Sequence, residues 1–399
     1  MANTLDRSDR VQLAVLDVAS FWLNIAGSVM GFALVYHYRR VFGLSPSSIG
    51  FSVSLSTFSY FLGCMCFTPI IRSLKPRYCV SISLVGMSVL LFLFLQTRSL
   101  GLAYLYIFIY GLCNSLLWPA VEMWLSRGKE GRALSVATGS FNFSWSIGAG
   151  LSSYVGGVLV SHSTFTAMWF TIIVYLVITL FLLVMATVNP SIRATQSETV
   201  QNRQEGKTDQ STPLRFFCWI NAALANAAVC MVGNTFPLYA QDVLAVNEKV
   251  TGALLLVRGF STCAVFLLLG RTNRWRFNRP MIILIPLALS VTSFIAPLFQ
   301  GKFALSWYFL SIGVLFACAY TMSMFHGISG ALHRSKRAGV HETVLALGSI
   351  TGVIAGGWLY QRYSFNVALS VVGAVSLVAF IGEGIGMFAL GKREKKAQI

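Results

Sequence analysis

Apolar stretches of about 20 residues recur along this chain, and no other feature limits its fold as strongly. An α-helix needs about 20 apolar residues to cross roughly 30 Å of hydrocarbon, whereas barrel strands would alternate polar and apolar side chains. Hydrophobic residues make up 56% of the sequence and charged residues 11%, against about 25% charged in a soluble domain. We therefore predict an all-α polytopic membrane protein with twelve spans, at about residues 11–37, 47–71, 78–96, 100–125, 133–160, 164–188, 216–240, 248–269, 279–299, 302–326, 338–360 and 365–390.

One polar segment divides the chain into two blocks of similar length. Residues 189–215 read NPSIRATQSETVQNRQEGKTDQSTPLR, with too few large apolar side chains to build a core. We predict an N-terminal six-helix bundle over residues 1–188, a cytosolic linker over 189–215 and a C-terminal six-helix bundle over 216–399.

The basic residues are distributed unequally between the two sides of the membrane. With the N-terminus in the cytosol, the termini, the linker and the cytosolic loops hold 23 of the 30 Lys and Arg, and the external loops hold 6. This asymmetry predicts that both termini are cytosolic. The net charge of +17 therefore reflects topology and attraction to anionic lipid, and we expect no nucleic acid as a partner. The polar start MANTLDRSDR predicts no signal peptide.

The two blocks match each other when they are aligned at an offset of 202 residues. The matched pairs include Asn24 with Asn226, Gly31 with Gly233, Gly50 with Gly252, Gly111 with Gly313 and Trp118 with Tyr320. Twelve spans in two parallel six-helix repeats resemble the major facilitator superfamily, and the resemblance covers essentially the whole chain. It implies two pseudo-symmetric bundles that rock about a central cavity and expose it alternately to each side. The compact loops and the length are typical of prokaryotic members in the inner or plasma membrane.

Glycines of the fifth and eleventh spans support the resemblance in part. Gly139, Gly148, Gly156 and Gly157 have the spacing of the family's antiporter signature, but Ser152 and Ser153 replace its Gly-Pro. The eleventh span repeats the pattern with Gly348, Gly352, Gly356 and Gly357. Glycines at such spacing let helix backbones approach closely. The pattern therefore favours the fold and does not favour antiport.

Ionisable residues within the spans are candidates for function, because a charge at the centre of a membrane helix costs about 2.5–3.5 kcal/mol or more. Arg258 lies near the middle of the eighth span, which lines the cavity in the family. It either binds an acidic group of the substrate, pairs with a buried acid, or alternates between these roles. Asp17 and Glu122 either carry a coupling H⁺ or Na⁺ or extend to the interface as ordinary surface carboxylates. We interpret Glu383, in the last span, as structural.

Neutral polar and aromatic residues complete the predicted substrate site. An unpaired amide in hydrocarbon costs several kcal/mol, so each asparagine in a span needs a partner in a wet cavity, a substrate or another helix. Hydrogen bonding between helices is the alternative for each residue. With Arg258, the predicted site comprises Asn24, Asn226, Asn114, Trp118, Asn142, Trp145 and Tyr320.

A cytosolic gate is predicted where the chain departs from the family. The family's loop after the second span carries an acidic residue that sits against the start of the eleventh span. Here that position is Arg72, and its repeat is Arg274. We predict an inverted pairing of Arg72 with Glu342, and of Arg274 with Glu122 or Glu130. The alternative is that all these charges are solvated and weakly interacting.

These features predict a secondary active transporter for a small organic solute that carries an acidic group, coupled to H⁺ or Na⁺. The alternatives are an efflux pump for lipophilic compounds and a lipid-handling or non-transporting receptor on the same scaffold. The sequence contains no metal-binding or phosphate-binding motif of an enzyme, and we expect no catalysis, cofactor or metal. We expect a monomer in the lipid bilayer.

Overall fold

The structure, a computed structural model, describes residues 7–126, 131–188, 211–298, 301, 304–331 and 334–397. These residues form helices and no strand. Twelve helices or helix pairs are long and apolar enough to cross a membrane, which confirms the predicted spans. The helices are α1 (Arg7–Arg40), α2 (Pro46–Cys66), α3 (Thr68–Ser73), α4 (Pro76–Gln96), α5 (Leu100–Asn114), α6 (Trp118–Ser126), α7 (Gly131–His162), α8 (Thr164–Val188), α10 (Leu214–Asp242), α11 (Glu248–Arg271), α12 (Arg279–Ile295), α13 (Ala304–Ile328), α14 (Arg334–Arg362) and α15 (Phe365–Ala397).

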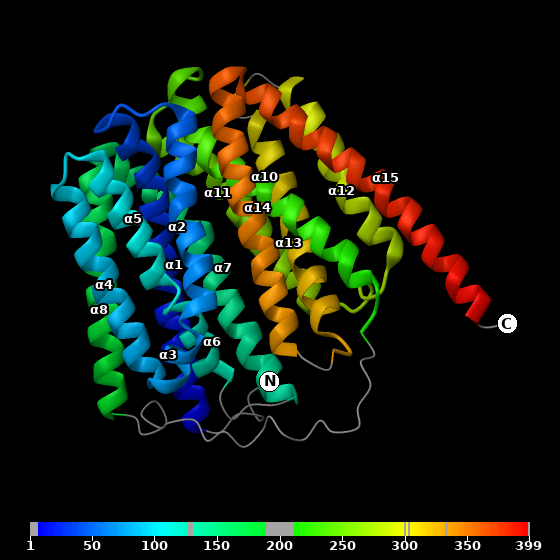
Figure 1. The fold of residues 1–399 in the computed structure, drawn as a ribbon, viewed down its shortest axis with the longest axis horizontal. Coiled ribbons are helices and arrows are strands. Elements are labelled where there is room, and N and C mark those ends of the chain that lie inside the picture. Colours follow the sequence, from blue (N-terminus) through cyan, green and yellow to red (C-terminus); the bar gives the residue numbers. More distant parts are fainter. Residues whose placement is uncertain are drawn as a thin grey trace.

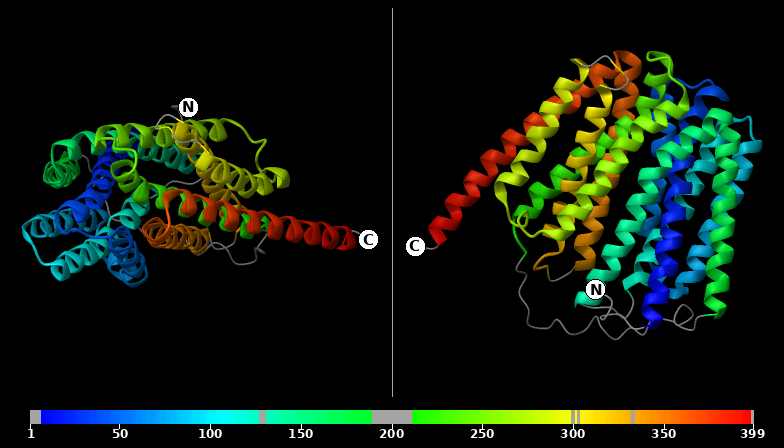
Figure 2. Two further views of the ribbon diagram at one scale, coloured as in Figure 1. Left: turned by 90° about the horizontal axis from the view of Figure 1, so that it is seen from above. Right: turned by 180° about the vertical axis from the view of Figure 1, so that it is seen from behind.

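The bundle has two ends that differ in how the helices are arranged (Figure 1). We call the end where α1 begins, α8 ends and α10 begins the base. The opposite end, where α1 ends and α2 begins, is the crown. Helices of the two bundles lie close together at the crown, whereas α15 slants away from the rest of the protein toward the base (Figures 1 and 2). Most of the predicted linker 189–215 falls outside the described residues.

The fourth span is broken into α5 and α6 at Ser115–Leu117. Pro119 has no N–H group, so it cannot donate to the carbonyl of Ser115 as a continuous helix requires. The amides of Leu116 and Leu117 instead reach back three residues, to Cys113 and Asn114, at 3.0 Å each. The hydroxyl of Ser83 on α4 donates to the carbonyl of Cys113 at 2.7 Å. The break thus places two predicted site residues, Asn114 and Trp118, on either side of it.

Glycines join the two bundles near the crown. A Cβ atom on Gly252 of α11 would lie 2.3 Å from the carbonyl oxygen of Ser153 on α7, and one on Gly50 of α2 would lie 2.7 Å from that of Val353 on α14. These separations are far shorter than any side chain tolerates, so only glycine permits the observed approach. Backbone contact at this distance seals the crown along both helix pairs.

The two seals are related by the internal repeat. Gly50 and Gly252 differ by 202 residues, and their partners Val353 and Ser153 differ by 200. A second pair follows the same rule, since Gly157 faces the carbonyl of Glu248 and Gly357 faces that of Pro46. The register of the fifth and eleventh spans is therefore shifted by two residues from the predicted offset. The glycine contacts are therefore related by the two-fold pseudo-symmetry expected from the sequence.

We predict that Gly252→Ala opens the crown. The added methyl group cannot fit beside Ser153, and overpacking of this kind costs about 1–3 kcal/mol. The distance between spin labels on the α1–α2 and α14–α15 loops, in a variant lacking native cysteines, should lengthen. Gly31→Ala is the matched control, because a Cβ there meets nothing within 4 Å. An unchanged crown distance in Gly252→Ala would contradict the role of this contact.

Candidate functional site

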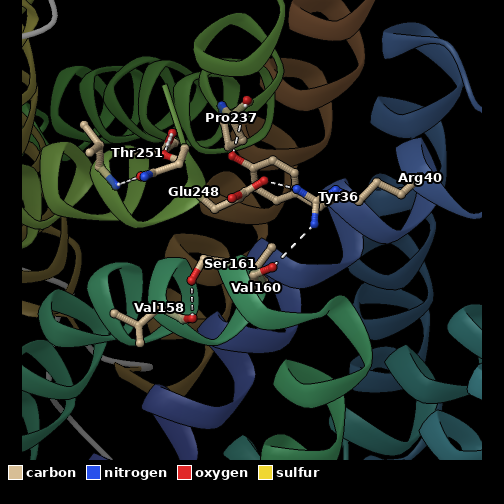
Figure 3. Close-up of polar contacts among 10 residues, drawn as sticks. Tyr36, Arg40, Val158, Val160, Ser161, Pro237, Glu248 and Thr251 are labelled. Atoms are coloured by element: carbon tan, nitrogen blue, oxygen red, sulfur yellow. Dashed lines mark hydrogen bonds and ion pairs between the residues drawn. The ribbon is translucent and has the colours of Figure 1, made fainter. Parts of the chain in front are cut away.

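An ion pair between the bundles closes the crown beside the glycine contacts (Figure 3). The guanidinium of Arg40, at the end of α1, pairs with the carboxylate of Glu248, at the start of α11. The same guanidinium donates to the carbonyl of Val160 on α7 at 3.4 Å and lies 5.1 Å from the ring centre of Tyr36. The hydroxyl of Tyr36 donates to the carbonyl of Pro237 on α10 at 3.4 Å. One arginine thus connects α1, α7 and α11.

A second ion pair lies next to the first. Arg39 approaches Asp242, at the end of α10, with 3.4 Å between Nη2 and Oδ1. The hydroxyl of Tyr360 on α14 donates to the other carboxylate oxygen at 3.2 Å. We call Arg39, Arg40, Asp242 and Glu248 the crown latch. Sequence analysis missed the crown latch because charges at span ends are usually solvated. The alignment of the two halves at an offset of 202 residues does, however, place Asp242 at the position that corresponds to Arg40.

Two carboxylates, one from each bundle, lie on the base side of the middle. Glu122 lies on α6 of the N-terminal bundle and Glu342 on α14 of the C-terminal bundle, and they are close enough to repel each other. Both side chains are exposed. Tyr60 on α2 and Tyr320 on α13 lie within electrostatic range of both acids. Both bundles thus contribute an exposed acid on the base side of the middle.

Aromatic side chains lie between the bundles near these acids. Trp145 on α7 and Tyr320 on α13 stack with 6.5 Å between ring centres and 21° between planes. The ring centre of Tyr320 also lies 5.6 Å from that of Phe266 and 4.8 Å from that of His341. The hydroxyl of Ser323 lies 2.7 Å from Nδ1 of His341. Trp145 and Tyr320 were both predicted as site residues, and the structure brings them together across the two bundles.

Arg258 lies in the middle of α11, half-buried, away from the two acids. Its Nη1 donates to the carbonyl of Val229 on α10, the neighbour of Cys230 in the sequence, at 3.2 Å. The ion pairs among described residues are the two of the crown latch, so Arg258 has no acidic partner within that part of the chain. Its position combines a fixed positive charge with a hydrogen bond that uses only one of its donors.

The predicted asparagines have different surroundings. Asn226 donates to the carbonyl of Leu345 on α14 at 2.7 Å, and its Oδ1 lies 3.8 Å from the sulfur of Cys230, next to Arg258. Asn24 is buried and donates to the carbonyl of Ser20 in its own helix at 3.0 Å. Asn142 is exposed, and Asn114 is half-buried at the break in the fourth span. Only Asn226 is thus connected to Arg258 by these contacts.

Asp17 occupies a polar site within the N-terminal bundle. Ser140 on α7 donates to its Oδ2, and Ser144 donates to its backbone carbonyl. Its other carboxylate oxygen, Oδ1, is buried without a partner. The side chain is therefore held between α1 and α7, and no described contact links it with Glu342 or Arg258.

The described residues include only part of the predicted gate at the base. Glu130 lies outside the described residues, as does the side chain of Arg72, although α3, which carries it, lies at the base. Arg274 is exposed, and no ion pair with Glu122 occurs between these two described residues. Since the bundles are separated here, the gate pairs Arg72–Glu342 and Arg274–Glu122 or Arg274–Glu130 stay predictions for a conformation with a closed base.

Comparison with known proteins extends over nearly the whole chain. A model described as Major Facilitator Superfamily matches residues 16–331. The crystal structure of the nucleoside transporter NupG superposes with a TM-score of 0.70 at 14% identity, covering 94% of this chain and 99% of that chain. A POT family transporter in complex with a thioalcohol conjugated peptide superposes with a TM-score of 0.73 at 10% identity, covering 95% and 96%. No curated protein matches the sequence.

We predict that reversing either charge of the Arg40–Glu248 pair opens the crown and that reversing both restores closure in part. Arg40→Glu and Glu248→Arg each place like charges side by side, whereas the double variant again pairs opposite charges. The spin-label distance across the crown would measure the populations. Restoration should be incomplete, because Arg40 also donates a hydrogen bond to the carbonyl of Val160 and packs on the ring of Tyr36. Purely additive effects would show that the pair does not hold the crown.

Proposed function

Because the chain belongs to the Major Facilitator Superfamily, we propose that it is a secondary active transporter that moves a small organic solute with an acidic group by alternating access. The observation that carries the proposal is the half-buried Arg258 without an acidic partner among the described residues. A cation kept in the middle of a membrane protein needs an anion or strong dipoles to offset its desolvation. The acidic group of a solute would supply that anion.

The conformation supports a transport cycle with a defined starting state. The crown is sealed by glycine contacts and the crown latch, while acids from both bundles are exposed on the base side. With both termini in the cytosol of a cell, as the basic residues predict, the base faces inward and this state is inward-open. The membrane is then the inner or plasma membrane.

Arg258 is suited to hold a carboxylate or phosphate. Val229 accepts from one terminal nitrogen, which fixes the side chain and leaves donors for a ligand. Asn226, one turn from Cys230 on α10, donates to the carbonyl of Leu345 on α14. A solute bound to Arg258 would therefore contact α10 and α11 of one bundle. The next residue, Gly259, is in backbone contact with Gly150 of α7, so the other bundle already lies close to this position.

The pair Glu122 and Glu342 is suited to couple transport to a proton. Two carboxylates from different bundles repel each other when both are ionised, and this repulsion grows as the bundles approach. A shared proton, or a bound Na⁺, removes the repulsion and permits the base to close. In this proposal Glu122 keeps the coupling role expected from its sequence, while Glu342 joins it from the gate. Asp17, held by Ser140 within one bundle, is better placed as a support for α7.

A second candidate is efflux of lipophilic cations. The two exposed acids lie beside Tyr60, Trp145 and Tyr320, and carboxylates with aromatic faces favour organic cations. Arg258 opposes such a cargo. Uptake and efflux assays with matched anionic and cationic solutes in liposomes distinguish the two functions by the charge that the protein selects.

We predict that Arg258→Ala abolishes transport of an anionic solute and that Arg258→Lys retains only weak binding. A lysine ammonium cannot reproduce the bidentate hydrogen bonds of a guanidinium. Accumulation by liposomes containing the purified protein is the measurement, preceded by a thermal-shift screen of organic acids to choose the solute. Arg271→Ala, at the base end of the same helix, is the control. Normal transport by Arg258→Ala would refute the anion-binding role.

We predict that Glu122→Gln and Glu342→Gln each lose accumulation driven by a proton gradient but keep exchange of internal for external solute. A permanently neutral side chain permits the base to close without a proton, so solute and proton movements become independent. Counterflow of labelled solute and pH-driven uptake, measured on the same liposomes, would show the difference. If both variants keep the pH dependence of the original protein, coupling resides elsewhere.

A further inference from the structure

A cavity of about 680 Å³ lies at the crown, at the opposite end of the protein from Glu122 and Glu342. The end of α10, the end of α14 and the start of α15 form most of its wall. Pro46, the first residue of α2, contributes from the N-terminal bundle. The cavity is within the size range of small-molecule sites, about 300–1,000 Å³.

The lining combines aromatic rings with one carboxylate. Tyr239, Tyr360, Tyr363 and Phe365 are the rings, and Asp242 is the only ionisable residue among the others. Tyr239 and Phe365 stack with 4.7 Å between ring centres and 18° between planes, while Tyr360 meets Tyr239 edge to face at 6.5 Å. None of the described residues that line the cavity is a lysine, arginine or histidine. The carboxylate of Asp242 is therefore the one formal charge on the described lining, and Arg39 pairs with it from outside the lining.

Asp242 has two partners and stays partly accessible. Arg39 lies 3.4 Å and 3.5 Å from its two oxygens, and the hydroxyl of Tyr360 lies 3.2 Å from Oδ2. Charge-assisted bonds between guanidinium and carboxylate are about 2.7–2.9 Å long. The side chain of Asp242 is also 31% exposed. Part of the carboxylate is therefore accessible to a ligand, which would share it with Arg39.

We propose that this crown cavity binds a small organic cation of the ammonium type, held by the carboxylate of Asp242 and the rings of Tyr360 and Tyr363, which are less buried than Phe365. Aromatic faces attract ammonium groups within about 6 Å, and a carboxylate adds the counter-charge. A metal ion is a poorer fit, since one carboxylate and amide oxygens do not make a full ligand set, and the described residues contain no group of three or more candidate ligands.

The site would couple ligand binding to the conformation of the transporter. Its wall includes Pro46 of one bundle and Gln361 of the other, and Oε1 of Gln361 accepts from the amide of Ser47 at 3.1 Å. Gly357, one turn away, is in backbone contact with Pro46. The complete cavity therefore exists only while the crown is closed. A ligand that binds this state alone shifts the population toward it, so the cation should slow turnover without competing with the transported solute.

Calorimetric titration of the detergent-purified full chain with choline tests the proposal. The probe is compared with its uncharged analogue, in which carbon replaces the quaternary nitrogen. Choline should bind, and the analogue at least about tenfold more weakly, because cation–π and ion-pair terms vanish together. Asp242→Asn should weaken choline binding about tenfold or more. Tyr363→Leu, which alters an exposed ring outside the crown latch, should weaken it severalfold.

Two control variants locate the bound probe. Glu248→Gln breaks the other ion pair of the crown latch without altering the cavity lining, so it measures how far crown opening alone weakens choline binding, and Asp242→Asn should weaken binding further. Glu342→Gln tests whether choline binds between the bundles instead, and should weaken binding less than Asp242→Asn does. The proposal is overturned by absence of choline binding, by equal binding of the uncharged analogue, or by loss of binding in Glu342→Gln with Asp242→Asn unaffected. Because Asp242→Asn could also open the crown, Tyr363→Leu and the uncharged analogue test the site independently of that variant.

Discussion

Backbone contact between helices at four glycines determines the arrangement of the two bundles. Gly50, Gly157, Gly252 and Gly357 bring α2 against α14 and α7 against α11 so closely that a methyl group would collide with a carbonyl oxygen. In lipid, helices gain little from apolar burial against each other, so close van der Waals packing must hold them. The glycines lie toward the crown end of their helices. Consequently the crown is closed, and the acids farther toward the base are exposed.

The fold follows from the sequence more completely than the site does. Twelve spans are visible as apolar runs, and the offset of 202 residues predicts the pseudo-symmetry that the glycine contacts display. The apolar runs and the repeat can both be recognised in the sequence without knowledge of the tertiary structure, because they are local or periodic. The two-residue register shift of α7 and α14 could not be predicted, because it depends on how these helices pack against α11 and α2.

The site residues required information that one sequence does not contain. An ionisable residue in a span can be recognised, but the direction of its side chain is set by helix rotation, and its partners lie on other helices. Thus the electrostatic interaction of Glu342 with Glu122 was not predicted, and Trp145 and Tyr320 meet although they were chosen independently. Arg39 and Arg40 seemed ordinary because charges at span ends usually face water. Their pairing with Asp242 and Glu248 depends on the closed crown.

The closed crown must be weak enough for the cycle to continue. The ion pairs of the crown latch are partly exposed, with 34% and 14% of the side chains of Arg40 and Glu248 accessible, and such pairs contribute at most about 1 kcal/mol each. Moving a two-state equilibrium from 1:99 to 99:1 takes about 5.5 kcal/mol. In the proposed cycle, this shift would come from removing the repulsion between Glu122 and Glu342 and from a solute anion bound to Arg258. Arg258 lies in the middle of its helix, whereas the weak ion pairs lie at the crown. In the proposed cycle, a ligand bound at Arg258 could therefore shift the equilibrium between the two conformations, because the crown is held by weak pairs.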